Sequence, residues 1–549
     1  MTFTSRLRRL AVGTVALAGV LLSAVASEPV PAPALTTLRV FAHPAVPDLQ
    51  CTSAPRSASP AAVVDADPRE VPDDEDIQAA LKATTGTSAR PVPVAPWGAG
   101  LLGHARPGEP YRVGIWGDSH LAAGFFTQAL VKRLQLAPEQ VRAGFIPASM
   151  NRPGVRLPLR KSCVSPQWRY ESAHASTAAA ATPGPGLVSL SSAQAGATLA
   201  WDLRNAAGAP EARQLRVLYQ QTANPVRLAV SVDGDQEVEV VLSGAPGPAA
   251  LELAADGPLS VVQLRLVSGE LRLQGLALPV PQQTAVQMDV FAYPGATVAG
   301  WKQAALDPLK AWFAQTRYDL VMLEFGTNEG NVKPFDASVY QTSLRESVQR
   351  MRSVFPDAAC VLIAPGDRGV LVRRSEKSRR VSPGVQSVTD KKVTKGATKG
   401  KSKGKAPTSA HASAQSKPKS LEARASKVKP GKQRKAAAPA TDAARAMPLD
   451  HAVETNSGAT RRDLLQYSHI HEEIGQIQRN VAQEQGCSAW SMQDAMGGPG
   501  SAYTWVRREP ALMARDLIHF TVPGYQQLAD QFANDMGWEA SQILSVTPP

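Results

Sequence analysis

The chain has 549 residues, of which 43% are hydrophobic and 19% charged, a composition typical of a globular protein of roughly three domains. Its net charge of +12 is concentrated in one segment, because residues 371–450 carry 21 Lys and Arg against 5 Asp and Glu. The remainder is mildly acidic. The composition therefore gives no indication of a globular domain that binds a specific nucleic acid.

The first 26 residues have the pattern of a secretory signal. Three arginines within the first nine residues precede an uncharged apolar run over 10–26, and Ala24-Val25-Ala26 fits the small-residue cleavage pattern. We therefore expect an exported, periplasmic protein with no transmembrane domain beyond this signal. Retention at the membrane by an uncleaved signal is the alternative.

Residues 27–95 are rich in Pro, Ala and Asp. This composition predicts a tether or wrapping segment that buries little surface, with one helix near Asp76 to Thr85. Over 96–162 the pattern becomes that of an α/β domain. An apolar run from Tyr111 leads through a glycine turn into a helix-like stretch from Leu121 to Leu134, which predicts strand, turn and helix.

Residues 163–283 have a different pattern, in which short runs of alternating apolar residues are separated by turn residues. Asp233-Gly234 marks a tight hairpin. Seven or eight short strands at this spacing predict an all-β sandwich or jelly roll inserted into the α/β domain. The runs begin near Gly186, Thr198, Gln214, Arg227, Val238, Val261 and Glu270.

The α/β pattern resumes over 284–370. A strand is predicted from Met288 to Tyr293, followed by a helix over 298–315. Leu320 to Phe325 is a near-continuous apolar run, typical of a strand that is covered on both faces. A helix over 338–354 and a strand at Cys360 follow.

Residues 371–450 combine high charge with low hydrophobicity and predict a disordered, Lys-rich insertion. Residues 451–549 return to the α/β pattern, with a helix over 460–485, a strand at Cys487 and a last helix over 523–536. The predicted fold class is α/β, with a parallel sheet of about five strands.

Four cysteines in an exported chain favour disulfides. Cys360 and Cys487 each begin an apolar run. If these runs are neighbouring parallel strands, both thiols lie at matching N-terminal ends, so we predict the pair Cys360–Cys487. This leaves Cys51–Cys163 as the second pair. No two cysteines lie close together in the sequence, so the spacing of a metal site is absent.

The octapeptide from Val113 to His120 joins an apolar run to a Gly-Asp-Ser turn and the start of a helix. This arrangement would place Ser119 at the carboxyl-terminal edge of a parallel sheet, where ligands bind in open α/β folds. Its backbone N–H would lie at the positive end of a helix, suited to stabilising an oxyanion. A serine that only caps the helix is the alternative for this octapeptide alone.

Asp516 and His519, just before the last predicted helix, supply the acid and base that a nucleophilic serine requires. The acid would bind one ring nitrogen and fix the tautomer. The other nitrogen would take and return the proton of Ser119. A surface capping acid and an incidental histidine are the alternative.

Two residues at other strand ends are candidates for an oxyanion hole. Gly295 ends the second strand of the α/β pattern and has no Cβ to obstruct a ligand near its N–H. Asn328 ends the third strand, so its amide can point into the same cleft. Together with the Ser119 N–H they make three donors. Taken separately, Gly295 is equally a turn residue and Asn328 a helix cap.

The motifs Gly-Asp-Ser, strand-end Gly, Gly-Thr-Asn-Glu and Asp-x-x-His, in this order, resemble the SGNH (GDSL-type) hydrolase superfamily. The resemblance implies a flavodoxin-like, three-layer fold. His120 in place of the commoner leucine, the β insertion and the loop Met496-Gly-Gly-Pro-Gly500 resemble the peptidoglycan O-acetylesterase branch. In that branch the inserted module resembles a carbohydrate-binding domain.

Carried over residue by residue, the resemblance makes Ser119 the nucleophile and Asp516 and His519 the rest of the triad. Gly295 and Asn328 become oxyanion-hole residues. The resemblance covers roughly 105–165, 285–370 and 460–540 well, the β insertion only in architecture, and the basic segment not at all.

The resemblance implies hydrolysis of acetyl esters on an acetylated envelope glycan, most directly the O6 acetyl of N-acetylmuramic acid in peptidoglycan. Ser119 would attack the acetyl carbonyl, and water activated by His519 would release acetate from the acetyl-serine. No metal or organic cofactor is required. The residues that bind the substrate are unknown, with Glu329 and the segment after Gly497 as unranked candidates for contacts with sugar.

Several alternatives stay open. The same triad can transfer an acetyl group to a sugar, so a polysaccharide O-acetyltransferase is the nearest rival, and another carbohydrate acetylesterase is a second. A non-catalytic protein that binds envelope glycan is the alternative from a different class. The basic insertion over 371–450 either contacts anionic envelope polymer or is a solvated loop.

Overall fold

The computed structural model describes residues 32–43, 46–51, 69–84, 109–178, 181–373 and 463–538. The predicted signal and nearly all of the Lys-rich insertion lie outside these residues, so both stay predictions. Within the part of the chain that is described, no helix has the length and apolar character needed to cross a membrane.

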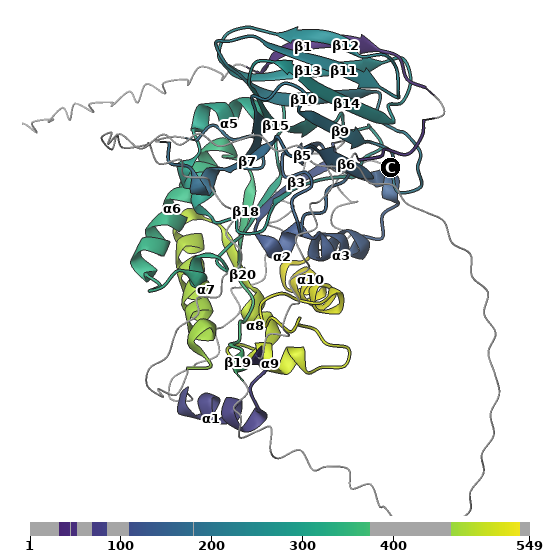
Figure 1. Cartoon of the computed structure of the whole chain (residues 1–549). Helices are drawn as coiled ribbons and strands as arrows, with labels where there is room; N and C mark the ends of the chain where they lie inside the picture. The colour runs from purple at the N-terminus through teal and green to yellow at the C-terminus, as the bar shows by residue number, and fades with distance from the viewer. Residues whose placement is uncertain are drawn as a thin grey trace, which may run out of the picture. The chain divides into compact units, whose positions relative to one another are not determined.

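A parallel sheet forms the centre of the α/β part, with β3, β18 and β20 labelled in Figure 1. It has six strands, in the order β20-β18-β17-β3-β16-β4. Apart from the two-residue edge strand β4, this is the 2-1-3-4-5 order of flavodoxin-like folds. The predicted α/β class and parallel sheet are therefore confirmed. The strands are β3 (Tyr111–Gly117), β4 (Val141–Arg142), β16 (Val286–Ala292), β17 (Leu320–Glu324), β18 (Ala359–Ala364) and β20 (Ser488–Ser491).

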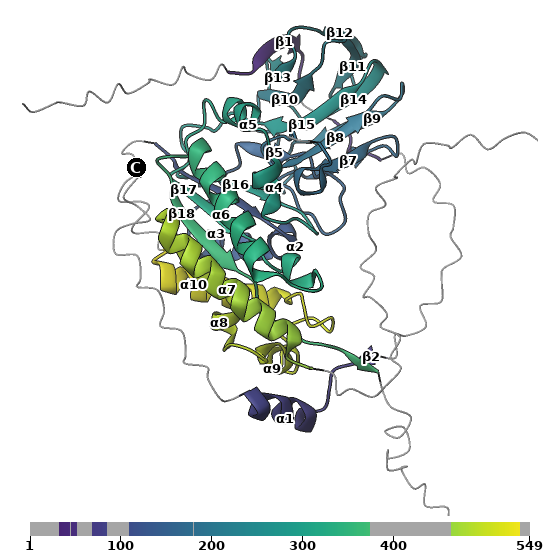
Figure 2. The same cartoon turned by 90° about the vertical axis from the view of Figure 1, so that its left-hand side faces the viewer.

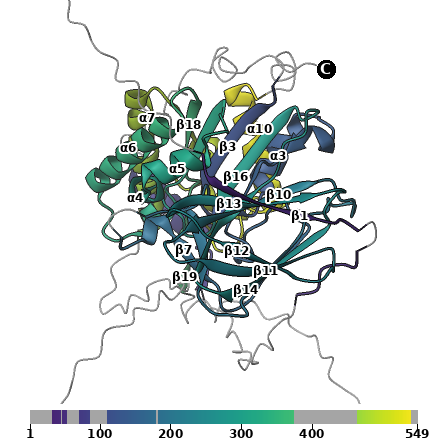
Figure 3. The same ribbon diagram turned by 90° about the horizontal axis from the view of Figure 1, so that it is seen from above.

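Helices cover both faces of this sheet, with α3 and α10 on one side and α4, α6 and α7 on the other (Figure 3). Figure 2 shows α6 and α7 side by side. Alternate strand residues supply two separate cores: Ile115 packs in one and Trp116 in the other. The helices are α2 (Ser119–Ala122), α3 (Phe125–Arg133), α4 (Ala299–Gln303), α5 (Leu306–Trp312), α6 (Ala337–Val354), α7 (Gln466–Gln485), α8 (Met492–Met496), α9 (Ser501–Val506) and α10 (Val522–Met536).

Two of the predicted helices are each broken into two. The stretch expected to be helical from Leu121 to Leu134 is interrupted at Gly124, whose φ of 73° is left-handed. The helix expected over 298–315 ends at Gln303, and α5 begins again with Pro308 in its first turn. A proline there needs no hydrogen-bonded N–H, whereas a continuous helix would require one.

Two further sheets pack against each other through one shared hydrophobic core. Strands β1 and β5 lie outside the predicted bounds 163–283, yet both belong to the seven-stranded sheet, which we call the first sandwich sheet. One sheet has β1 (Ala34–Val40), β5 (Phe145–Pro147), β7 (Arg169–Ser172), β8 (Val188–Ser192), β10 (Gln214–Gln221), β13 (Gly247–Ala255) and β15 (Leu271–Ala277); the other has β6 (Lys161–Val164), β9 (Thr198–Asp202), β11 (Val226–Val232), β12 (Val238–Leu242) and β14 (Val261–Ser268).

The N-terminal segment contributes more than the expected wrapping. Strand β1 pairs in parallel with β13, and its Leu38 and Val40 pack against the sandwich core. Helix α1 (Asp74–Thr84) buries Ile77 in the core of the α/β part. Among the described residues of this segment, the apolar side chains of Leu49 and Ile77 are buried. The sequence predicted the helix but not the strand β1. The two-residue strands β2 (Arg69–Glu70) and β19 (Val372–Arg373) also pair.

Two disulfides link distant parts of the chain, Cys51–Cys163 and Cys360–Cys487, the pairs expected from the sequence. Strands β18 and β20 are parallel neighbours, with Val361 opposite Ser488. The second disulfide therefore closes the N-terminal ends of these strands.

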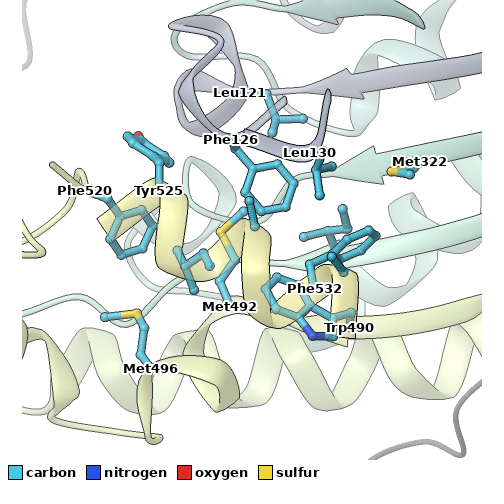
Figure 4. Close-up of a cluster of buried hydrophobic side chains, with 14 of the residues drawn as sticks. Leu121, Phe126, Leu130, Met322, Trp490, Met492, Met496, Phe520, Tyr525 and Phe532 are labelled. Carbon is cyan, nitrogen blue, oxygen red and sulfur yellow. The ribbon is translucent and has the colours of Figure 1, made fainter. Parts of the chain in front are cut away.

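Helices α3 and α10 pack against each other through aromatic and aliphatic side chains (Figure 4). Phe532 of α10 is fully buried, and its ring lies 5.8 Å from that of Phe126 on α3 and 5.2 Å from that of Trp490 on β20. Leu130 completes this contact. The cluster fixes the start of the chain's α/β part against its end.

Replacing Phe532 with alanine should lower the free energy of unfolding by about 3–5 kcal/mol, because it removes a buried ring and leaves a cavity. Val339→Ala is the matched control, because Val339 lies on a helix with 64% of its surface exposed. This substitution should hardly change the free energy of unfolding. Denaturant unfolding of both variants gives the comparison. Equal losses would contradict the role assigned to Phe532.

Candidate active site

Three strand ends meet at one level of the parallel sheet. Gly117, the last residue of β3, lies opposite Ala292 of β16 on one side and Glu324 of β17 on the other. A Cβ on Gly117 would approach the Leu121 side chain to 2.6 Å and the Glu324 carboxylate to 2.9 Å. Only glycine fits this turn, which presents the next two residues at the carboxyl edge of the sheet.

Ser119, His519 and Asp516 form a hydrogen-bonded chain at this edge. Ser119 Oγ lies 3.1 Å from His519 Nε2, and His519 Nδ1 lies 2.7 Å from Asp516 Oδ2. The histidine can therefore take the serine proton at one nitrogen while the carboxylate holds the proton on the other. This is the geometry of a Ser-His-Asp triad, with the imidazole already in contact with the serine hydroxyl.

The short Asp-x-x-His spacing is possible because Asp516 binds its own turn. Its Oδ1 accepts hydrogen bonds from the N–H groups of Ile518 and His519, both at 3.0 Å, and leaves Oδ2 for the imidazole. Leu517 between them has a φ of 57° and a fully buried side chain. The left-handed residue costs about 1–2 kcal/mol, which its burial offsets.

Hydrogen bonds keep Asp516 ionised over the pH range in which His519 titrates. Burial raises the pKa of Asp516, but the hydrogen bonds from the His519 ring and from two backbone N–H groups outweigh it and lower that pKa to about 2. The hydrogen bond to Asp516 in turn raises the pKa of His519 above its ordinary value, despite burial. The carboxylate is therefore charged whenever the imidazole titrates.

Two fully buried carboxyls lie beneath the nucleophile. The Asp118 N–H donates to Glu324 Oε2 at 3.1 Å, and Asp118 Oδ1 accepts from the His120 N–H at 2.9 Å. Burial raises the pKa of Asp118 to about 6, and burial together with the Asp118 charge raises the pKa of Glu324 well above its ordinary value. Of the two carboxyls, Glu324 therefore holds its proton to the higher pH.

His120 has a structural role that the sequence left unexplained. His120 is 99% buried. The centre of its ring lies 5.1 Å from that of the tilted Phe520 ring, and its Nδ1 lies 3.4 Å from the Tyr525 hydroxyl. Burial lowers its pKa to about 3, so the ring is neutral. His120 thus joins the serine turn to α10 and to the loop that carries His519.

Gly295 lies in a tight turn after β16, next to the serine turn. Its φ is 82°, its surface is exposed, and a Cβ would meet nothing within 4 Å. Within the described residues, neither the Gly295 N–H nor the Ser119 N–H donates a hydrogen bond to the protein. Both are available to a ligand. Helix α2 has only four residues, so the Ser119 N–H itself, rather than the helix dipole expected from the sequence, is the relevant donor.

Asn328 lies beside this site, and its side-chain amide already donates hydrogen bonds within the protein. Nδ2 donates to the Ala296 carbonyl at 2.8 Å and to Asp118 Oδ2 at a longer 3.3 Å. The longer bond is the one that a substrate oxygen would replace, so the oxyanion role of Asn328 requires this exchange. Glu329 points inward: its carboxylate accepts from the N–H groups of Val298 and Gly326, which argues against the sugar contact considered for it.

The site is open rather than enclosed. The side chains of His519 and Asp516 keep 32% and 41% of their surface exposed. A cavity of about 310 Å³ lies elsewhere, between the sandwich and the opposite ends of β3 and β16, with Arg112 and Trp312 in its lining. No cluster of ligands for a metal ion occurs among the described residues.

The sequence motifs pointed to Ser119, Asp516 and His519, and the structure brings these three together. It adds Glu324, which had a signal in the sequence: a carboxylate inside an otherwise apolar run predicted to be covered on both faces.

Glu324→Gln should keep most of the stability and activity, because the amide replaces a neutral acid and still accepts the Asp118 N–H. Glu324→Leu should lose about 1–3 kcal/mol, since it leaves that N–H unpaired. The unfolded chain releases the Glu324 proton near the ordinary value of 4.5, whereas the folded chain keeps it. Wild-type stability therefore falls as the pH rises above 4.5, and the Gln variant lacks this contribution.

Unfolding of both variants at pH 4.5 and pH 8 tests this. The stability of the Gln variant relative to wild type should be more favourable at the higher pH. A difference that does not change with pH would show that Glu324 is ionised in the folded protein.

Solved structures similar to this chain include a peptidoglycan O-acetylesterase, with 18% identity and a TM-score of 0.47 over 80% of this chain and 95% of that one. A putative GDSL-like lipase from Parabacteroides merdae has 12% identity and a TM-score of 0.24, over 46% and 74%. A catalytic mutant of an acetylxylan esterase from Geobacillus stearothermophilus has 13% identity and a TM-score of 0.23, over 47% and 76%. Models of protein families and curated proteins give no match to the sequence.

At these identities and TM-scores the similarities assign neither an activity nor a substrate, which have to come from the chain's own residues. Its Gly-Asp-Ser turn ends the first strand of the parallel sheet, and Asp-x-x-His precedes the last helix. In its motifs, its strand order and the geometry of its triad, the chain resembles the SGNH hydrolases.

Proposed function

We propose that this protein is a serine esterase that removes O-acetyl groups from a cell-envelope glycan. The observation that carries the proposal is the contact of Ser119 Oγ with His519 Nε2 at 3.1 Å, oriented by Asp516. The substrate class rests on the resemblance of the motifs to the peptidoglycan O-acetylesterase branch. Within it, the O6 acetyl of N-acetylmuramic acid is the expected ester.

The reaction would proceed in two steps. His519 removes the serine proton as Oγ attacks the acetyl carbonyl, and then returns it to the departing sugar hydroxyl. The oxyanion of the tetrahedral intermediate would accept hydrogen bonds from the N–H groups of Ser119 and Gly295 and from the Asn328 amide. Each donor would lower the barrier by about 2.7–4 kcal/mol. Water activated by His519 then releases acetate.

Two features support water as the acceptor and a polymer as the substrate. The exposed faces of His519 and Asp516 give water direct access to the acetyl-serine, which favours hydrolysis over transfer to a second sugar. An open edge also admits a long glycan, whereas an enclosed pocket would select small esters. The non-catalytic alternative is disfavoured because nucleophile, base and acid are in hydrogen-bond contact.

We also propose export to the periplasm. Two disulfides in the folded chain support this location, because such bonds persist in oxidising compartments. The sugar-binding role considered for the segment after Gly497 and the contact of the basic insertion with anionic polymer stay predictions.

Ser119→Ala should reduce acetate release by at least about 10³-fold, since it removes the nucleophile and leaves only the oxyanion donors. Acetate released from O-acetylated peptidoglycan and from acetylated xylan, by wild type and by this variant, gives the test. Release from peptidoglycan should exceed release from xylan.

The same assay separates the alternatives. Acetyl groups that appear on an added acceptor glycan, without free acetate, would assign the protein as a transferase. A preference for xylan would keep the esterase and reject the envelope substrate. Undiminished release by Ser119→Ala would reject the triad.

Activity should rise with pH as His519 loses its proton, with a midpoint above the ordinary imidazole pKa of 6.5. Asp516→Asn removes the carboxylate that raises that pKa, so the acidic limb should move to lower pH. It should also lower kcat by about 10³–10⁴-fold, because the ring loses its tautomer control. The pH profile of kcat/KM on an aryl acetate measures both effects; an unmoved limb would contradict the pairing.

A further inference from the structure

An arginine from outside the triad reaches the turn that carries Gly295. Arg152 Nη2 donates a hydrogen bond to the Pro294 carbonyl at 3.0 Å. Arg152 lies on the connection between β5 and β6, so it approaches the site from the side of the sandwich. None of the steps described above uses this residue.

The turn is of type II. The Ala296 N–H donates to the Tyr293 carbonyl at 3.2 Å, proline occupies the second position and Gly295 has a φ of 82° at the third. The Pro294 carbonyl and the Gly295 N–H belong to the same peptide unit, which is planar and trans. They therefore point in opposite directions, and whatever fixes the carbonyl also aims the N–H.

The turn alone does not fix this peptide unit. A type I turn has the same ends and differs by a flip of the central peptide, and glycine at the third position tolerates both forms. Gly295 is exposed, and no neighbouring atom lies within 4 Å of where its Cβ would be. Packing therefore cannot select one orientation, and the partner of the Pro294 carbonyl does.

We propose that Arg152 is a positioning residue that holds the Pro294–Gly295 peptide with its N–H aimed into the oxyanion hole. The inference rests on the proposed esterase function. A cationic donor on the carbonyl also polarises the amide, so the N–H becomes a stronger donor to the developing oxyanion. Loss of Arg152 would thus weaken transition-state binding without touching the nucleophile.

The sandwich holds Arg152 in place. Its guanidinium lies 4.7 Å from the centre of the Tyr293 ring and 5.7 Å from that of Tyr170, and Nη1 donates to Ser172 Oγ at 3.4 Å. Tyr170 and Ser172 belong to β7 of the first sandwich sheet. Tyr293 is the first residue of the turn itself, so cation–π contacts and the serine hydroxyl hold the guanidinium between the turn and β7. The inserted β part thereby contributes to the catalytic geometry.

Arg152→Ala should lower kcat on an aryl acetate by about 10–100-fold and leave KM little changed. The loss should not exceed that expected when one oxyanion donor is removed. Arg152→Lys should be intermediate, because one ammonium can reach the carbonyl but cannot span to Ser172 as well. Added guanidinium should restore part of the activity of the alanine variant. Gly295→Ala should also lower kcat, since a Cβ disfavours the positive φ of the type II turn.

Arg156→Ala is the matched control, from the same connection, with an exposed side chain bonded to Gln128 at 3.3 Å. It should leave kcat unchanged. Thermal unfolding of every variant accompanies the kinetics. A kcat of Arg152→Ala equal to that of Arg156→Ala would overturn the inference. So would a loss matched by reduced thermal stability and unaffected by lysine or guanidinium, because that outcome indicates a purely structural role.

Ser119→Ala separates this failure from failure of the proposed function. If wild type hydrolyses the aryl acetate and Ser119→Ala does not, an unaffected Arg152→Ala variant rejects the positioning role alone. If Ser119→Ala keeps the wild-type rate, both the esterase and the positioning role are rejected.

Discussion

The register of the parallel sheet is the constraint on which the site depends. Because Gly117 lies opposite both Ala292 and Glu324, the three turns that follow these strands begin at the same height. Ser119, Gly295 and Asn328 come from these turns. A shift of one residue in any of the three pairings would move a turn by about 3.3 Å and reverse its side chains. The hydrophobic cores on both faces of the sheet fix that register.

Contacts across the fold then hold together groups that lie 400 residues apart, Ser119 and His519. Phe532 packs α10 against α3, and His120 ties the serine turn to α10. The Glu324 carboxyl, kept neutral by burial and by its neighbour, binds the turn from below. A buried charge at this place would require a counter-ion, whereas a neutral acid needs only its hydrogen bonds.

Local signals in the sequence sufficed for the main strands of the parallel sheet, for the residues of the triad and for the disulfide between parallel neighbours. They failed where structure depends on tertiary contact. Strand β13 is rich in Ala, Gly and Pro, which have low strand propensity, and only burial of Leu251 and Leu253 in the sandwich makes it a strand. Strand β1 lies more than 200 residues from the partner it pairs with. The contacts of Arg152 likewise join three separate segments, which no window of the sequence contains.

The Pro294–Gly295 peptide is the place where the two parts of the protein act on one group. The α/β sheet sets its position, through the register of β16, and the sandwich sets its orientation, through Arg152 and β7. If only the position of this peptide were fixed, the Gly295 N–H would spend part of its time turned away from the oxyanion. The fold of the sandwich is then a condition for the proposed oxyanion hole, because the exposed glycine turn cannot hold its own peptide plane.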